Sequence, residues 1–194
     1  MKTWAVIPLK RLDNAKTRLS TILTAEERRN LMLKLFSHVL ETCVNGNLRC
    51  IVVAENPEIE KYTLKLDQHF ILDSSGDLNE AVAKGLEYAE HKRFEGCLIV
   101  FADLPFLTVD DVNTIIRLLD FSNIVLCPDL SLEGTNIVGL RRGVDFFKPE
   151  FGDRSYLRFV ESLHDFKTYL SLGTGLDLDK PEQFKDAKAR GFIL

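Results

Sequence analysis

The sequence predicts a single α/β domain of three layers, an αβα sandwich in which helices cover both faces of a mostly parallel mixed sheet. Apolar runs of strand length alternate with amphipathic stretches of helix length along all 194 residues. Several of these runs are apolar at nearly every position, as in "CIVVA" (50–54), which is typical of strands that are buried on both faces. No repeat, low-complexity tract or Pro/Ser-rich linker interrupts the chain. We therefore expect one domain over residues 1–194.

The expected elements follow one another with short connections. Strands are expected at 3–9, 49–54, 69–73, 97–102, 123–128 and 135–140. Helices are expected at 25–43, 57–66, 78–91, 109–119, 154–164 and 181–190. Capping boxes support two helix starts, because Thr24 precedes Glu27 and Asp77 precedes Glu80 at the spacing that lets side chains and backbone N–H groups satisfy one another.

The segment at about 129–156 breaks this alternation. Strand-like pieces flank Gly134, and Gly152 stands just before a predicted helix. Ligands of open α/β sheets bind beyond the carboxyl ends of the strands, so we expect an irregular, substrate-binding insertion here.

Composition excludes several function classes. The apolar fraction of 45% and the charged fraction of 28% are those of an ordinary globular protein. The net charge of −4 gives no bulk attraction to nucleic acid. No apolar run approaches the roughly 18 residues of a membrane span, and the N-terminus does not resemble a signal peptide. We expect a cytoplasmic protein without nucleic-acid or membrane partners. The sequence leaves the oligomeric state open, with a homodimer as one candidate.

The cysteines and histidines carry little chemistry. Cys43, Cys50, Cys97 and Cys127 show no C-x-x-C spacing, and three of them lie in or beside apolar runs. We expect them to be buried free thiols. The four histidines are dispersed, so a histidine metal site or a Ser/His/Asp triad has little support.

A basic stretch follows the first predicted strand. The sequence "IPLKRLDNAKTRLS" (7–20) sets Lys10, Arg11, Lys16 and Arg18 against one acid, Asp13. In a doubly wound sheet this loop faces phosphates, so the stretch predicts a nucleotide-phosphate site. It lacks the glycines of the common phosphate-binding fingerprints, and a solvated basic loop remains the alternative.

Three acids suggest a divalent cation. Asp103 follows an apolar strand in "FADLPFLT", where Pro105 keeps the chain extended. Asp177 and Asp179 alternate on an extended segment, so both side chains point to the same side and repel unless a cation, a helix N-terminus or solvent relieves them. The alternatives are a simple turn at Asp103 and a helix cap at Asp179, just before Pro181.

Two further stretches suggest an anion site. Thr135 in "EGTNIVGL" and Ser155 in "FGDRSY" offer hydroxyl groups, while Gly134 and Gly152 allow a ligand to approach the backbone closely. Turns and caps are the alternative. At the start of the 78–91 helix, Asn79 is a candidate contact for the base or ribose of a nucleotide, as is Glu80, which equally suits a cap.

Six stretches in this order together resemble the 2-phospho-L-lactate guanylyltransferases of archaeal coenzyme F-420 biosynthesis. They are "IPLKRLDNAKTRLS", "DLNEAVAKG", "ADLPFLT", "EGTNIVGL", "FGDRSY" and "LDLDKPE", and the resemblance runs from about residue 4 to residue 184. It implies a GT-A-like fold, similar to nucleotide-diphosphosugar transferases and molybdenum-cofactor guanylyltransferases. It also implies that GTP and 2-phospho-L-lactate are joined, with Mg²⁺, to give lactyl-2-diphospho-5′-guanosine and pyrophosphate. Bacterial relatives are associated with phosphoenolpyruvate instead.

The resemblance also implies roles for individual residues. The magnesium ligands would be Asp103, Asp177 and Asp179. The phosphorylated acid would be held by Thr135, Gly152 and Ser155. Lys16 would face the nucleotide phosphates together with its basic neighbours, and Lys16 and Asp103 would be the catalytic pair.

Three positions depart from the family pattern. Ala102 replaces a glycine, Glu133 replaces an aspartate, and Phe159 replaces a histidine found four residues after the serine. If that histidine touches substrate elsewhere in the family, we expect Arg158 or Arg154 to act in its place. Alternatives for the function are a guanylyltransferase that uses phosphoenolpyruvate or 3-phosphoglycerate, a sugar-phosphate or molybdopterin nucleotidyltransferase, and a catalytically silent nucleotide-binding protein.

Overall fold

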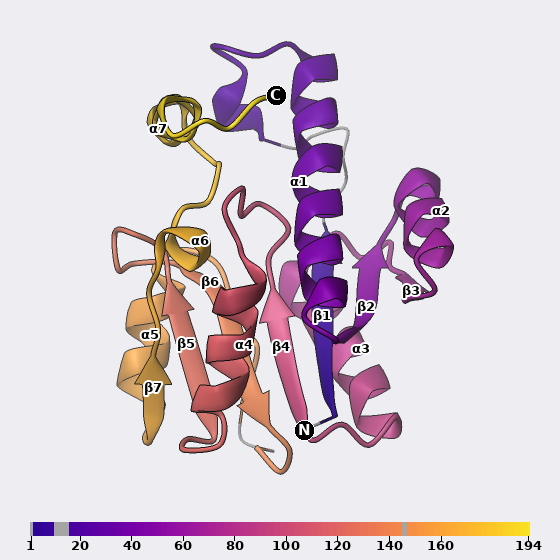
Figure 1. The fold of residues 1–194 in the computed structure, drawn as a ribbon, viewed down its shortest axis with the longest axis vertical. Helices are drawn as coiled ribbons and strands as arrows, with labels where there is room; N and C mark the ends of the chain where they lie inside the picture. The colour runs from indigo at the N-terminus through magenta and orange to yellow at the C-terminus, as the bar shows by residue number, and fades with distance from the viewer. Residues whose placement is uncertain (1, 10–15, 145–146) are drawn as a thin grey trace.

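The structure is a computed structural model that describes residues 2–9, 16–144 and 147–194. Lys10 and Arg11, two of the predicted phosphate contacts, lie outside these described residues. Within them, one seven-stranded sheet is sandwiched between helices (Figure 1). The predicted three-layer α/β fold is therefore confirmed.

The sheet is mixed and mostly parallel. Its strands are β1 (Thr3–Leu9), β2 (Arg49–Ala54), β3 (His69–Leu72), β4 (Gly96–Val100), β5 (Ile124–Pro128), β6 (Thr135–Arg141) and β7 (Phe166–Thr168). They lie in the order β3-β2-β1-β4-β6-β5-β7, and β6 alone among these described strands runs antiparallel to its neighbours. The carboxyl ends of β1 and β4 therefore meet the amino end of β6 at one edge of the sheet.

Helices cover both faces of the sheet. They are α1 (Ala25–Asn45), α2 (Pro57–Lys65), α3 (Leu78–His91), α4 (Val109–Leu118), α5 (Ser155–Ser162), α6 (Leu172–Gly175) and α7 (Pro181–Ala189), with a 3-10 helix η1 (Thr17–Leu19). Helices α1 and α4 pack on one face, and α3 and α5 on the other (Figure 1). The twelve predicted elements are all found with bounds within two residues of those expected, whereas the sequence does not predict η1, β7 or α6.

The core explains why the strands are apolar on both faces. In β1, Ile7 packs into the cluster beneath α1, whereas Val6 packs into the cluster beneath α3. A Cβ atom at Gly85 of α3 would lie 2.3 Å from Val6 Cγ1, so only glycine lets this helix lie so close to the sheet. Burial of each large apolar side chain contributes about 1.5–3 kcal/mol to the framework that carries the sheet edge.

The helix caps are mostly those that the sequence predicts. Thr24 and Glu27 form both bonds of the capping box at α1. At α3 the box is incomplete: Asp77 accepts hydrogen bonds from two backbone N–H groups, but its own N–H donates to Ser75 Oγ at 3.2 Å instead of to Glu80. The predicted box at Asp77 is therefore half right.

The segment predicted as an irregular insertion is irregular only at its flanks. It contains β6, which pairs with both β4 and β5 in the sheet, because "TNIVGL" is apolar enough to be buried there. The loops on either side of β6 remain available to form the wall of a binding site.

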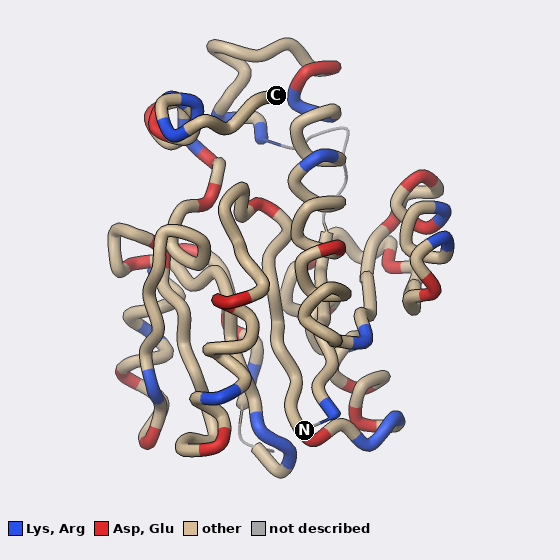
Figure 2. The backbone as a smooth tube through the Cα atoms, in the orientation of Figure 1, with Lys and Arg blue, Asp and Glu red and all other residues tan. Residues whose placement is uncertain are grey.

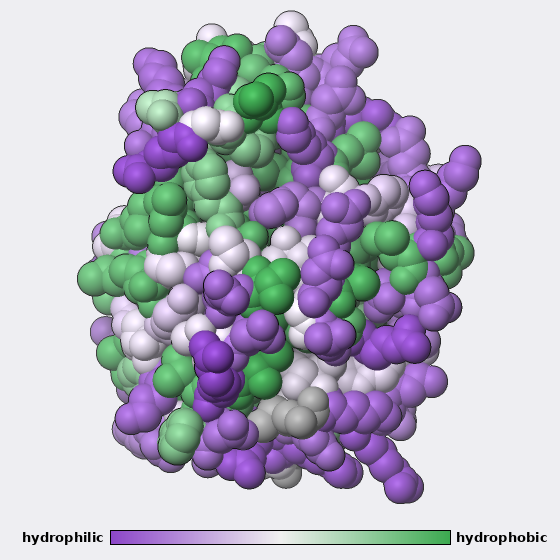
Figure 3. Space-filling view, in the orientation of Figure 1, coloured by the Kyte–Doolittle hydropathy of each residue, from purple (hydrophilic) through white to green (hydrophobic). Residues whose placement is uncertain are grey.

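Two other expectations concern burial and the surface. All four cysteines are buried, as predicted. Among the described residues, no helix combines the length and the apolarity needed to cross a membrane. Apolar side chains gather on the surface around α6 (Figure 3), where four leucines are exposed: Leu130, Leu132, Leu170 and Leu172.

Candidate active site

A cavity of about 650 Å³ opens where β1 and β4 end and β6 begins. Its walls come from η1, the turn after β4, the loop between β5 and β6, the start of α5, and the segment that joins α6 to α7. It brings together the predicted residues Lys16, Arg18, Asp103, Thr135, Gly152, Ser155, Asp177 and Asp179. The cavity thus lies at the edge of the sheet where the sequence predicts the site.

Lys16 and Asp103 form the centre of this cavity. Lys16 Nζ donates to Asp103 Oδ2 at 2.7 Å, and 7% of the Lys16 side chain is exposed. Burial acts to lower the pKa of Lys16, but the negative charge of Asp103 and its hydrogen bond outweigh that effect and raise the pKa. The other oxygen, Asp103 Oδ1, is buried and has no hydrogen-bond partner in the described structure.

The two acids from the far end of the chain join this pair. Asp179 Oδ1 lies 3.7 Å from Lys16 Nζ, and Asp179 Oδ2 accepts from Arg18 at 2.5 Å. Asp177 Oδ1 accepts from Gln183 Nε2 at 2.9 Å. Burial, and next the negative charge of Asp103, raise the pKa of Asp177 to about 6. Figure 2 shows the acidic stretch between α6 and α7 that carries both residues.

Backbone contacts hold these acids in place. The N–H of Leu178 donates to Asp103 O at 3.0 Å, which ties the segment carrying Asp177 and Asp179 to the turn after β4. Gln183 Oε1 accepts from the N–H groups of Asp179 and of the next residue. Lys180, not Asp179, is the N-cap residue of α7, so the alternative in which Asp179 caps that helix is wrong.

The three acids suit a hard divalent cation. Carboxylate oxygens are the ligands that Mg²⁺ prefers, and the buried, unpaired Oδ1 of Asp103 needs a cation or a donor. In the described structure the acids surround Lys16 Nζ, and no three His, Cys, Asp or Glu side chains of this part of the chain stand at metal-binding spacing. The donor set fits magnesium, and its role as a metal site stays a prediction.

The opposite wall carries free hydroxyl groups. Thr135 N donates to Ser155 Oγ at 3.1 Å, which leaves the Ser155 hydroxyl proton available to a ligand. Thr135 Oγ1 is buried without a hydrogen-bond partner among the described residues. Gly152 has a φ of +130°, a conformation that favours glycine. Orphaned buried donors of this kind are satisfied when an anion binds.

Asn79 lies at the start of α3, as predicted, but its side chain is hydrogen-bonded to a distant loop. Its side-chain amide accepts from Phe151 N at 2.8 Å and donates to Phe151 O at 3.3 Å. The amide therefore holds the segment before Gly152 in place, and Asn79 is not among the residues that line the cavity. The sequence also missed Asn136, whose buried amide lines the cavity and donates to the carbonyls of Thr174 and Gly175.

Phe159, Arg158 and Arg154 have different surroundings in the structure. Phe159 is buried among aromatic rings, including those of Phe147 and Phe151. Arg158 donates to the backbone carbonyls of two residues in the preceding loop. Arg154 is exposed and lines the cavity.

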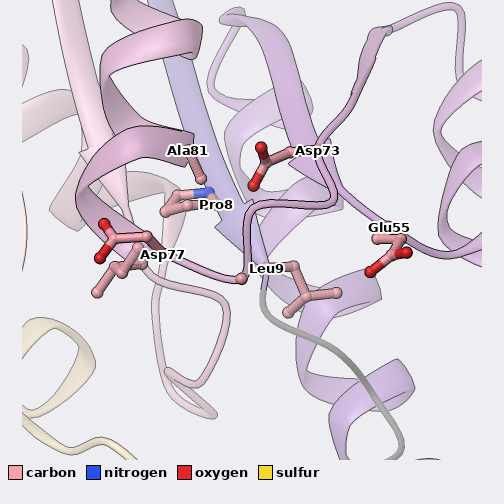
Figure 4. A pocket seen from close by; sticks show the side chains of 8 residues that line it. Pro8, Leu9, Glu55, Asp73, Asp77 and Ala81 are labelled. Carbon is pink, nitrogen blue, oxygen red and sulfur yellow. The ribbon is translucent and has the colours of Figure 1, made fainter.

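A small pocket of about 10 Å³ adjoins the large cavity at the end of β1. Both are lined by Pro8, Leu9 and Leu78. Figure 4 shows the carboxylates of Glu55, Asp73 and Asp77 around this pocket. Burial acts to raise the pKa of Asp73, but hydrogen bonds from Lys84 and Ser75 lower it.

A second acidic centre, the carboxylate of Asp111, lies outside the cavity and holds segments of the site in place. Asp111 accepts from the Thr108 hydroxyl at 2.6 Å, from Ser171 Oγ at 2.6 Å and from Tyr169 OH at 2.9 Å. A Cβ atom at Gly173 would lie 2.3 Å from Asp111 Oδ2, so α6 packs directly on this carboxylate. Asp111 thereby joins the start of α4 to the segment that leads to Asp177.

Residues 3–187 match the family model described as guanylyl transferase CofC like. The chain belongs to this family. This CofC-like chain is 32% identical to a phosphoenolpyruvate guanylyltransferase of Sphaerobacter thermophilus, over 96% of this chain and 92% of the relative. It is 26% identical to a 2-phospho-L-lactate guanylyltransferase of Methanocaldococcus infernus, over 96% of this chain and 84% of the relative.

Solved structures share the fold of this CofC-like chain. A crystal structure of a putative nucleotide-diphospho-sugar transferase from Desulfovibrio desulfuricans G20 superposes with a TM-score of 0.72 and 13% identity. The match covers 92% of this chain and 83% of the other. Family membership makes the chain a nucleotidyltransferase, and the likeness confirms the fold class that its motifs imply.

Proposed function

We propose that this chain transfers the guanylyl group of GTP to the phosphate of a small phosphorylated carboxylic acid and releases pyrophosphate, in coenzyme F-420 biosynthesis. One observation carries the proposal: three carboxylates and a buried lysine meet across a cavity from a wall of free hydroxyl groups. This reaction requires three kinds of group. They are acids that bind a cation, a cation that faces phosphate, and donors that receive a second anion.

The acid substrate is 2-phospho-L-lactate in the reaction implied by the sequence motifs. Phosphoenolpyruvate is the second candidate, since the relative at 32% identity is named for it while the relative named for phospholactate is 26% identical. Both molecules carry a carboxylate and a phosphate on the same carbon atom. The hydroxyl groups of Thr135 and Ser155 can donate to either one.

The reaction needs little acid-base chemistry from the protein. A phosphomonoester carries about −1.5 to −2 charges near pH 7, so one of its oxygens can attack the α-phosphorus of GTP without a general base. The new bond forms between that oxygen and the α-phosphorus, and the bond to the β-phosphate breaks as pyrophosphate leaves. The barrier is repulsion between two polyanions, which cations and in-line positioning reduce.

The chain's own charges match that requirement. Asp103, Asp177 and Asp179 would hold Mg²⁺, which supplies positive charge to the reacting phosphates. Lys16 would exchange its contact with Asp103 for a contact with a nucleotide phosphate, because the ammonium group then keeps one anionic partner. Arg18 adds a second cation at the same mouth of the cavity.

The small acidic pocket offers a reason for choosing guanine. The Watson–Crick edge of guanine presents two N–H donors where adenine presents an acceptor at N1. Carboxylates such as Asp73, which follows β3 and lines this pocket, accept hydrogen bonds, so a base whose edge faces the pocket is favoured when it is a guanine.

A substrate panel tests the proposal. Purified chain with Mg²⁺ is given each of four nucleoside triphosphates with 2-phospho-L-lactate, phosphoenolpyruvate or 3-phosphoglycerate, and pyrophosphate release is measured. We expect release with GTP and one phosphorylated acid, and its loss when EDTA removes the metal. Calorimetric binding of GTP without pyrophosphate release from any pair would contradict the proposal and indicate a silent nucleotide-binding protein.

A further inference from the structure

Arg154 is a cation of the cavity wall whose role the assignments above leave open. We propose that Arg154 binds the carboxylate of the phosphorylated acid and so determines which phosphomonoesters the site accepts. The inference rests on the proposed function, because it assumes that such an acid occupies the cavity.

The order of groups along the cavity wall separates the two ends of the acid. Phe101 N donates to Asn136 O at 3.1 Å, so the start of β6 lies beside the turn that carries Asp103. Ser155 Oγ is one hydrogen bond beyond Thr135, and Arg154 precedes Ser155. The phosphate must lie near Asp103 to react, which leaves the carboxylate toward Arg154.

Arg154 is the uncommitted cation of this wall. It forms no ion pair or side-chain hydrogen bond within the part of the chain that the structure describes. Its neighbour Arg158 donates to the carbonyls of Glu150 and Asp153, and Lys16 and Arg18 face the acids proposed to bind magnesium on the other side. The planar guanidinium of Arg154 suits a carboxylate, to which it can donate two parallel hydrogen bonds.

The charges around Arg154 make a cation necessary there. Glu133 and Asp153 also line this wall, so an anionic substrate meets negative charge unless Arg154 faces it. The buried hydroxyl of Thr135, which has no hydrogen-bond partner among the described residues, offers a donor to the phosphate of the same substrate. Without Arg154, the wall would have donors for the phosphate of the substrate, but the carboxylate of the substrate would lie beside Glu133 and Asp153.

The backbone at Arg154 supports a functional role. Its φ of 50° and ψ of 33° are left-handed, a conformation that disfavours a residue with a side chain. Glycine would adopt this conformation without strain. Lys16, with a φ of 53°, is the other cavity-lining residue with a side chain in this conformation, so both ends of the described cavity hold a cation on a strained turn.

The test compares substrates with and without a carboxylate. Steady-state rates are measured with the active acid and with its analogue lacking the carboxylate, ethyl phosphate for phospholactate or vinyl phosphate for phosphoenolpyruvate. The variants are Arg154→Ala, Arg154→Lys and Arg154→Gly, with Arg142→Ala as an exposed arginine beyond the other end of β6. Melting temperatures are measured in parallel.

We expect Arg154→Ala to raise KM for the acid by roughly 10- to 100-fold, with kcat and KM for GTP little changed. The preference for the acid over its analogue should fall by the same factor, and Arg154→Lys should restore part of it. Arg154→Gly should lose the preference while its melting temperature stays equal or rises, which a purely structural role would not produce. Arg142→Ala should match the wild type.

An active wild-type protein whose preference for the carboxylate is the same in Arg154→Ala overturns this inference alone. A wild-type protein that transfers guanylyl to none of the acids overturns the proposed function, and this inference with it. The two failures are therefore separated by the wild-type measurement.

Discussion

Two acidic centres, a buried one at Asp111 and a half-buried one at Asp103, Asp177 and Asp179, lie near the same edge of the sheet and behave in opposite ways. Burial acts to raise the pKa of Asp111, but hydrogen bonds from Ser171, Thr108 and Tyr169 lower it below its ordinary value. Asp177 has one side-chain donor, Gln183, and its pKa is raised to about 6 by burial and by Asp103. The first carboxylate has a full set of partners, whereas the second is held beside other negative charges.

This difference distinguishes a carboxylate that stabilises the fold from carboxylates that are arranged to bind a ligand. A carboxylate that accepts several hydrogen bonds stabilises the fold and resists protonation. Carboxylates that face one another destabilise the ligand-free protein until a cation arrives. Asp111 therefore positions α6 and the segment after it, while Asp103, Asp177 and Asp179 are arranged for a charged ligand. The predictions below test this contrast.

The largest effect is expected for Asp103→Asn. The change removes a negative charge that faces the proposed metal and Lys16 while keeping the side-chain volume, so pyrophosphate release should fall by roughly 100- to 1000-fold. The unfolding midpoint should remain close to that of the wild type. Asp110→Asn, which alters an exposed acid in the first turn of α4, is the matched control and should keep full activity. Near-normal turnover of Asp103→Asn would exclude it from the metal site.

Asp111→Asn should instead destabilise the fold, by about 2–3 kcal/mol at pH 7, because the amide group cannot accept all the hydrogen bonds that the carboxylate accepts. The lowered pKa means that this carboxylate stabilises the fold above pH of about 4 and that its contribution is lost as the pH falls through the folded-state pKa. Urea unfolding at pH 7 and pH 3.5 should show the gap narrowing at low pH. Equal stability at pH 7 would contradict the framework role.

Asp177→Asn should have the opposite sign. Because the folded-state pKa is raised to about 6 from its ordinary value of 3.8, the folded wild type binds the proton more tightly and loses stability as the pH rises through that window. The amide carries no charge, so the ligand-free variant should be more stable by about 2 kcal/mol at pH 7.5, with the gap closing near pH 4. Urea unfolding at both pH values measures it, and a less stable variant at pH 7.5 would refute the raised pKa.

Tyr169→Phe should have the smallest effect. It removes one of the donors to Asp111 and leaves the bonds from Thr108 and Ser171, so the unfolding free energy should fall by about 1 kcal/mol. Urea denaturation at pH 7 is again the measurement. A loss as large as that of Asp111→Asn would mean that the tyrosine, and not the carboxylate, holds the cluster together.

The framework was predictable because its signals are local. Apolar runs define the long strands, and caps such as Thr24 and Thr108 define helix starts within a few residues of sequence. By contrast, β7 has three residues at the edge of the sheet, too few to show a pattern. Helix α6 contains two glycines, and contacts of Ser171 with the distant Asp111 help to hold it.

The site residues that stand in short motifs could be predicted from the sequence. Residues whose role depends on a contact with a distant part of the chain could not. Lys16, Asp103 and Thr135 lie in such motifs and meet as expected. Asn79 reads as a free amide at a helix start, yet its partner Phe151 is 72 residues away. Asn136 offered one signal, an amide within an apolar strand, which must find partners when it is buried.

The most direct measurement is a ¹³C NMR titration of the aspartate side-chain carboxyl carbons, assigned with the variants above, with and without Mg²⁺ and GTP. We predict that Asp177 titrates near pH 6 in the ligand-free protein, that Asp111 titrates below 3.8, and that Mg²⁺ with GTP lowers the Asp177 midpoint while leaving Asp111 unchanged. An Asp177 midpoint that does not move when Mg²⁺ and GTP are added would contradict the account.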